Sequence, residues 1–274
     1  MSDQTTSPTP PKAATLPAEF SVRLRSLTPA RIGLAQAGES LATREVLDFQ
    51  LAHGQARDAV HAALQTRALL GELKKLTWLG NSLAPLILHS CAADRPSYLK
   101  RPDLGRKLDE PSLTLLARHS GQPHDLSIVL ADGLSALAVE RHAIPVVSSL
   151  LSALERVSPT PSLAPITIVE QARVAVGDTI SQAQQSNLVI VLIGERPGLS
   201  SHDSLGAYIT WRPQPGRTTD AERNCISNIR IEGLNYAEAA GRLLYYIQEA
   251  TSKQTTGIAL KDPQLTAALQ GGEK

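Results

Sequence analysis

Several common sequence features are scarce in this chain, and each absence excludes a class of function. Its 274 residues include only two cysteines, Cys91 and Cys225. They form no spaced metal-binding motif, and we expect free thiols in a cytosolic protein rather than a disulfide. Lys and Arg number 27 against 26 Asp and Glu, a net charge of +1, which gives no electrostatic basis for binding nucleic acid or an anionic membrane.

Long hydrophobic runs and familiar ligand motifs are also missing. No apolar run approaches the ~20 residues of a membrane span, and the N-terminus lacks a signal-peptide core. The chain contains no G-x-G-x-x-G dinucleotide motif, no G-x-x-x-x-G-K-[ST] phosphate loop and no H-E-x-x-H helix. Aromatic residues make up 3% of the chain, so the core must consist mainly of Leu, Ile, Val and Ala.

The composition and the apolar pattern divide the chain into three parts, with boundaries near residues 20 and 95. Residues 1–20 are rich in Ser, Thr, Pro and Ala and are predicted to be a disordered tail. Residues 21–95 are predicted to form a small helical domain, because apolar residues between about 40 and 79 recur at helical spacing. Residues 96–274 are predicted to form a second, larger domain.

That larger domain alternates between strand and helix patterns. Strands are predicted at 126–130, 166–169, 188–193 and 207–211, and helices at 103–119, 142–157, 177–185 and 235–251. Pro111 suggests a break in the first helix, and Pro145 suggests the first turn of the second. The alternation predicts an α/β fold, a Rossmann-like parallel sheet covered on both sides and preceded by the helical domain.

The run Leu188–Ile193 has no polar alternation, as expected for a central strand buried on both faces. It opens directly into Gly194–Leu199, which carries Glu195 and Arg196. Loops at the carboxyl ends of such strands are where open α/β sheets bind ligands. Two interpretations stay open for Glu195: an ion pair with Arg196 that shapes the loop, or contact with a ligand.

A second strand terminus carries Asp132 and Ser135. A serine nucleophile needs a positioned histidine and an orienting group. His142 is near in sequence, but nothing in the pattern fixes its geometry. We therefore expect Asp132 or Ser135 to cap the following helix or to bind a polar ligand group, and we predict no catalytic residue in this chain.

Longer motifs give the chain a family resemblance. They are H-G-Q-A-R-D-A-V from His53, D-R-P-S-Y-L-K-R-P-D-L-G-R from Asp94, A-D-G-L-S-A from Ala131, G-E-R-P-G-L from Gly194, S-L-G-A-Y from Ser204 and R-N-C-I-S-N-I from Arg223. In this order the chain resembles the small (light) subunit of ethanolamine ammonia-lyase, over roughly residues 30–250.

The resemblance implies a cofactor, adenosylcobalamin, and three residues that contact it. Glu195 and Cys225 match the family's contact positions within G-E-R-P-G-L and R-N-C-I-S-N-I, and Val174 matches a valine shortly before the central strand. A carboxylate can accept hydrogen bonds from the amides of the corrin ring. Valine would give an apolar wall and Cys225 a small packing residue. The chain lacks the D-x-H-x-x-G motif, so no such histidine replaces the cofactor's own lower base on cobalt.

The resemblance further implies that the chain is half of an enzyme that converts ethanolamine to acetaldehyde and ammonia by radical chemistry. The large (heavy) subunit would carry the substrate site, and the two would form a hetero-oligomer. The expected location is the cytoplasm, with a bacterial microcompartment as the alternative. The rival hypothesis is a non-enzymatic Rossmann-like module that binds a ligand or a partner protein.

Overall fold

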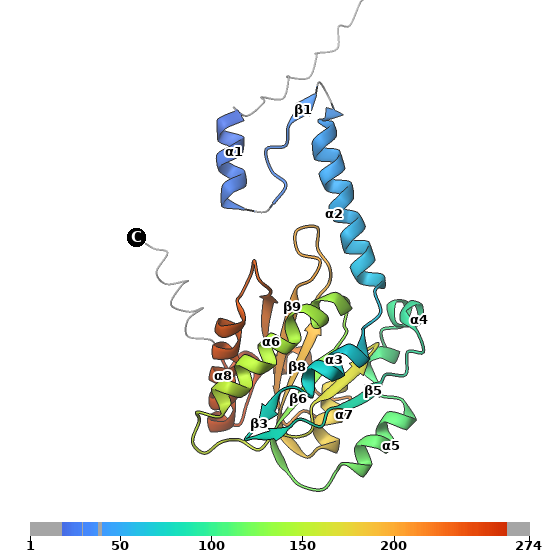
Figure 1. The fold of residues 1–274 in the computed structure, drawn as a ribbon, viewed down its shortest axis with the longest axis vertical. Helices are drawn as coiled ribbons and strands as arrows, with labels where there is room; N and C mark the ends of the chain where they lie inside the picture. The colour runs from blue at the N-terminus through green and yellow to red at the C-terminus, as the bar shows by residue number, and fades with distance from the viewer. Residues whose placement is uncertain (1–17, 29, 38–39, 262–274) are drawn as a thin grey trace, which may run out of the picture. The chain divides into compact units, whose positions relative to one another are not determined.

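The computed structural model describes residues 18–28, 30–37 and 40–261 (Figure 1). By its internal contacts the chain divides into two units, residues 1–54 and 55–274. The predicted tail lies outside the described residues up to residue 17, and α1 begins at Ala18.

Unit 1 consists of helices joined by a short hairpin. Its elements are α1 (Ala18–Leu27), β1 (Gln36–Ala37), β2 (Ser40–Leu41) and the first part of α2 (Thr43–His61). Arg25 of α1 pairs with Glu45 of α2 at 3.0 Å, which ties the two helices together. The helical pattern predicted between 40 and 79 is thus only partly right, because β2 precedes α2 and a hairpin follows α3.

Unit 2 is built on a mostly parallel sheet. Its strands, in chain order, are β3 (Thr77–Trp78), β4 (Asn81–Ser82), β5 (Leu86–His89), β6 (His124–Ala131), β7 (Thr167–Glu170), β8 (Ser186–Gly194), β9 (Leu205–Trp211) and β10 (Asn224–Ile229). Six of them form one sheet in the order β10-β9-β8-β6-β7-β5, while β3 and β4 pair separately. Strands β5 to β8 run parallel, and β9 and β10 are antiparallel to their neighbours.

A fully parallel sheet was predicted, and the antiparallel pair has a simple cause. The connection from Gly194 to Leu205 is too short for the crossover that a parallel strand requires. The amide of Glu195 donates to the carbonyl of Ser204 at 2.9 Å, which closes a hairpin instead. The next connection, from Trp211 to Asn224, returns the chain along the outer edge.

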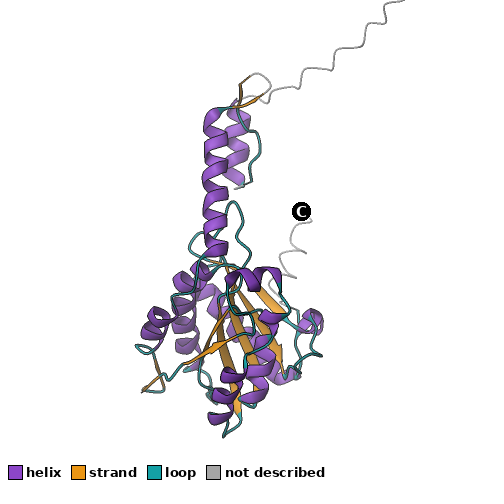
Figure 2. Ribbon diagram, turned by 90° about the vertical axis from the view of Figure 1, so that its right-hand side faces the viewer, coloured by secondary structure: helices purple, strands orange, loops and turns teal. Residues whose placement is uncertain are grey.

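Helices cover both faces of the sheet, which gives three layers (Figures 1 and 2). The helices of unit 2 are α3 (Thr66–Leu73), α4 (Arg95–Lys100), α5 (Glu110–Arg118), α6 (Ala136–Leu154), α7 (Val176–Ala183) and α8 (Tyr236–Lys253), with single turns at Leu104–Arg106, Asp220–Glu222 and Gly257–Ala259. Helices α3, α6 and α8 share one apolar core with the sheet, and α5 and α7 share the other. The cores are mainly aliphatic, as the composition predicts.

Two prolines were assigned positions from the sequence, with different outcomes. Pro111 lies in the first turn of α5 and separates it from the turn Leu104–Arg106, as predicted. Pro145 was expected near a helix start, but it lies inside α6, which begins nine residues earlier at Ala136. The earlier start follows from Ser135, whose side chain caps the helix by accepting from the amide of Ala138 at 3.3 Å.

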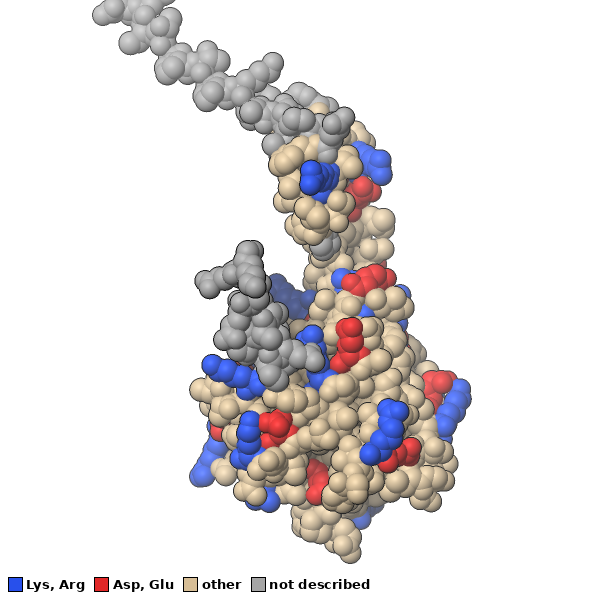
Figure 3. Space-filling view, turned by 90° about the vertical axis from the view of Figure 1, so that its left-hand side faces the viewer, with Lys and Arg blue, Asp and Glu red and all other residues tan. Residues whose placement is uncertain are grey.

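Helix α6 is the one described helix long and apolar enough to cross a membrane by length and composition. Half of that stretch is buried, and its side chains form much of the core between the sheet and α8. These contacts are those of a core helix. On the face drawn in Figure 3, Lys and Arg alternate with Asp and Glu, in keeping with the balanced composition.

Candidate functional site

The β9–β10 end of the sheet has one covered face and one open face, which is exposed along β10 and largely buried along β9. Leu205, Ala207 and Ile209 point into the core shared with α6 and α8. The alternate residues on β9 point the other way, and on β10 Cys225 and Ser227 are exposed on that side. This open face of β9 and β10, next to α7, is where the predicted site residues meet.

Glu195 lies at the rim of the open face, directly after β8. Its Oε2 accepts hydrogen bonds from the Ser204 hydroxyl and, at 3.3 Å, from the amide of Asn228. Within the described part of the chain its Oε1 accepts no hydrogen bond, and Glu195 makes no ion pair with Arg196, which is exposed. The loop-shaping ion pair is therefore not formed, and one carboxylate oxygen stays available.

Gly206 allows Glu195 to lie flat against β9. A Cβ atom at Gly206 would lie 3.0 Å from Oε1 of Glu195 and 3.1 Å from its Cγ, so a side chain there would displace the carboxylate. Beside Tyr208 and this carboxylate, the open face presents the small exposed side chains of Cys225 and Ser227. Such a floor fits a flat ligand, and the free carboxylate oxygen can accept from that ligand's amides.

Cys225 is directly opposite Tyr208 in the antiparallel pair β9–β10. Its thiol is free and lies 3.3 Å from the Ser227 hydroxyl. Partial loss of hydration against its neighbours raises the pKa of the thiol, even though the residue is exposed. Desolvation, followed by the neighbouring Cys225 and Glu195, raises the pKa of Tyr208 to about 12. Both groups are neutral at pH 7, so neither is prepared for nucleophilic attack.

Val174 reaches the same region from a different element. It lies in the β7–α7 loop and packs, partly buried, with Tyr208 on the core that includes α7. Both line a hollow of about 810 Å³ between this loop, residues 103–107 and residues 215–223. Tyr208 therefore joins the three predicted residues: it pairs with Cys225, lies near Glu195 and shares a hollow with Val174.

Asp132 positions the loop that carries Val174. Its buried carboxylate accepts from the amides of Gln171 at 2.9 Å and Ala172 at 2.8 Å, and it lies 3.4 Å from a guanidinium nitrogen of Arg95. The Tyr98 hydroxyl donates to the carbonyl of Ala172 at 3.1 Å. Asp132 thus fixes the backbone of the loop that carries Val174, a role that the sequence did not specify.

Ser135 and His142 have separate hydrogen-bond partners and do not pair with each other. Ser135 caps α6 and donates to the carbonyl of His202 at 3.0 Å. His142 lies beside the Tyr236 hydroxyl, with Nδ1 and oxygen 2.9 Å apart, and Nε2 is 3.5 Å from Asp203. The capping role expected for Ser135 is confirmed, and these contacts leave no serine–histidine pair.

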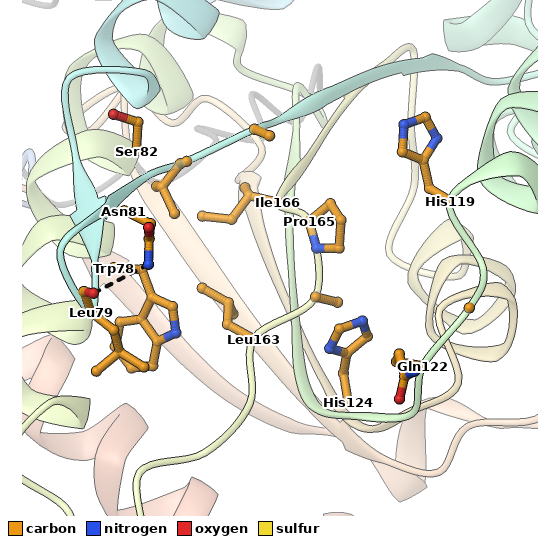
Figure 4. Close-up of a pocket in the computed structure, with 14 residues that line it drawn as sticks. Trp78, Leu79, Asn81, Ser82, His119, Gln122, His124, Leu163, Pro165 and Ile166 are labelled. Carbon is orange, nitrogen blue, oxygen red and sulfur yellow. Dashed lines mark hydrogen bonds between the residues drawn. The ribbon is translucent and has the colours of Figure 1, made fainter.

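A second hollow, of about 460 Å³, lies at the other edge of the sheet (Figure 4). Trp78, Leu163 and Ile166 line it together with His119 and His124. It adjoins the amino ends of β6 and β7, whereas ligands of open α/β sheets bind at the carboxyl ends. Within the described residues no group of three His, Cys, Asp or Glu side chains could hold a metal ion.

Fold and site together define an α/β protein with a partly exposed face at one end of a mostly parallel sheet. A family model of the ethanolamine ammonia-lyase light chain matches residues 18–261. The chain belongs to that family.

Named relatives agree over nearly the whole length. The ethanolamine ammonia-lyase small subunit of Pseudomonas aeruginosa (strain UCBPP-PA14) is 52% identical over 252 residues, which cover 90% of this chain and 89% of the relative. The small subunit of Ralstonia nicotianae (strain GMI1000) is 50% identical over 254 residues, 92% of this chain and 91% of the relative. That of Pseudomonas syringae pv. tomato (strain DC3000) is 50% identical over 277 residues, with coverage of 100% and 93%.

Proposed function

We propose that this chain is the small subunit of ethanolamine ammonia-lyase and that its open β9–β10 face covers part of adenosylcobalamin. The observation that carries the proposal is the convergence of Val174, Glu195 and Cys225 around Tyr208. The three come from different elements, and the resemblance implies all three from the sequence alone.

The residues present suit the chemistry of a corrinoid. The small side chains of Cys225 and Ser227 leave room for a broad ring, and Oε1 of Glu195, which lies against Gly206, can accept from its peripheral amides. Val174 and Tyr208 offer apolar surface at the edge. When bound, the cofactor supplies radical chemistry at its cobalt–carbon bond, while these side chains bind it, orient it and exclude water.

The substrate site is proposed to lie on the large subunit, with which this chain forms a hetero-oligomer. Unit 1 offers a surface for such a partner, because apolar side chains are strongly exposed on α1 and α2: Val22 at 68%, Leu27 at 76%, Leu47 at 58% and Leu51 at 63%. Monomeric proteins rarely keep a large apolar surface exposed. We expect the isolated chain to associate with itself and to show no lyase activity.

Three finer expectations belong to the same proposal. The sheet domain, which also includes β5 from the preceding segment, is Rossmann-like and binds cobalamin through residues 96–274, and a helical part lies before it within residues 21–95. The protein works in the cytoplasm, either free or packaged in a bacterial microcompartment. If packaging occurs, the segment before residue 18 is where a packaging signal would be sought.

Reconstitution tests the proposal directly. The chain and a family large subunit are co-expressed, purified as a complex and mixed with adenosylcobalamin, and cofactor that stays with the complex is measured by visible absorbance after gel filtration. We expect retained cofactor and ethanolamine deamination by the complex, and neither by the chain alone. A complex that turns over no ethanolamine and retains no corrinoid would favour the non-enzymatic binding module.

A further inference from the structure

The hollow beside Val174 contains an excess of positive charge. Its buried Arg223 is already neutralised, since two nitrogens of its guanidinium donate to both oxygens of Asp178 at 2.7 Å. Asp103, at the opposite wall, accepts two hydrogen bonds from Arg101 at 2.9 and 2.7 Å. The exposed Asp220 lies 3.7 Å from Nε of Arg223. The acidic groups that line the hollow are therefore all engaged with these two arginines.

Three other cations line the same hollow: Arg106, Lys107 and Arg173. Within the described residues none of the three forms an ion pair or donates a side-chain hydrogen bond. Arg106 and Lys107 are exposed, but Arg173 is half-buried, and its Nε is fully buried with no hydrogen-bond acceptor. A buried donor without an acceptor costs free energy unless a ligand supplies one.

Arg173 is nevertheless held in place. Its guanidinium lies over the ring of the buried Tyr98, 4.5 Å from the centroid, and its amide donates to the carbonyl of Gly105 at 2.7 Å. A Cβ at Gly105 would lie 2.9 Å from the Tyr98 ring, so only glycine lets the turn before Arg106 approach this closely. The motif that begins at Asp94 thus brings its last residue, Arg106, and the following Lys107 to the side of Arg173.

We propose that Arg173, with Arg106 and Lys107, binds a phosphodiester anion, the one in the nucleotide tail of cobalamin. The inference rests on the proposed function and extends it to a second part of the ligand. Guanidinium groups suit phosphate because their planar donors match its oxygens. The neighbouring residue is Val174, assigned to the macrocycle or its lower base, and the phosphate of cobalamin lies on the tail between these two moieties.

A comparison of two corrinoids distinguishes phosphate binding by these three residues from a general contribution to cofactor binding. Cyanocobalamin carries the phosphodiester, and dicyanocobinamide lacks the nucleotide and its phosphate. Each is titrated by absorbance against the complex of this chain with the large subunit, using the wild type, Arg173→Met, Arg173→Lys and an Arg106→Gln/Lys107→Gln double variant. Arg118→Met, an exposed arginine on α5, is the matched control.

We expect Arg173→Met to weaken cyanocobalamin binding about tenfold or more, as for loss of a charge-assisted hydrogen bond, and dicyanocobinamide binding less than about twofold. Arg173→Lys should recover part of the loss, the double variant should share the selectivity and Arg118→Met should behave as wild type. Equal losses for both corrinoids, or none for either, would overturn the site.

Two further outcomes distinguish a failure of the phosphate site from a failure of the proposed function. Inorganic phosphate is tested as a second ligand. If it raises the melting temperature of the wild-type complex but not of Arg173→Met, and if each corrinoid binds the wild type and Arg173→Met with equal affinity, the site belongs to a free anion and not to the tail. If the wild-type complex retains neither corrinoid, the proposed cofactor role fails and this inference fails with it. Thermal melts of every variant show whether Arg173→Met still folds.

Discussion

Glu195→Gln tests the cofactor role at the residue where structure and resemblance agree most closely. Oε2 of the carboxylate is occupied by the Ser204 hydroxyl and the Asn228 amide, while Oε1 is free over Gly206. Glutamine can keep one oxygen for the internal contacts, but it then turns an NH₂ group toward the open face. The variant therefore replaces the ligand-facing acceptor with a donor and removes the charge.

The expected loss is one charge-assisted hydrogen bond to a corrin amide, about 1–2 kcal/mol, or a five- to thirtyfold rise in the apparent dissociation constant of adenosylcobalamin. The apparent affinity for ethanolamine should change much less. Cofactor is titrated against the reconstituted complex, with a thermal melt in parallel. Glu249→Gln serves as the control, because α8 packs on the opposite face of the sheet.

The opposite pattern would contradict the assignment. If Glu195 only joins the end of β8 to β10 through Asn228, the variant should lower the melting temperature and leave the cofactor affinity of the folded complex unchanged. That result would leave the open face without its polar contact and would assign Glu195 a structural role.

Three further predictions follow from the same structure. Asp178→Asn leaves the buried guanidinium of Arg223 without its counter-charge and should lower the free energy of unfolding by about 3–5 kcal/mol. Asp220→Asn, at the exposed partner, should change the free energy of unfolding by less than about 1 kcal/mol. Denaturant titration measures both, and equal effects would refute the buried pair. Because the pKa of the Cys225 thiol is raised, its alkylation by iodoacetamide in a variant without the other cysteine should be slower at pH 8 than that of a free cysteine. Its rate should still rise with pH where the rate of the free cysteine has levelled off, and fast reaction at pH 7 would contradict the raised pKa. Removal of residues 1–15 should leave complex formation and activity nearly unchanged, and a large fall in melting temperature would show that this segment is structural.

Local patterns predicted much of the sheet domain. The unbroken apolar run at 188–193 became β8, and Asn235 caps α8 by accepting from the amide of Glu238 at 3.0 Å. These features depend on neighbours in the chain, which is why the sequence alone could place them. β10 was missed because only Ile226 and Ile229 of it enter the core, and a bulge between them breaks the alternation on which strand prediction depends.

The meeting of the site residues was beyond local prediction, because it depends on the direction of β9. Had the chain crossed over after β8 to make a parallel strand, Tyr208 and Cys225 would not face each other in a hairpin pair. The short connection after Gly194 forces the antiparallel return, and the alternation of Ala207 and Ile209 into the core then turns Tyr208 outward. The position of Tyr208 between Ala207 and Ile209 therefore already predicts that its side chain faces away from the core that those two residues enter. It becomes informative only once Cys225 and Ser227 on the neighbouring strand are known to be exposed, and no motif predicts that exposure.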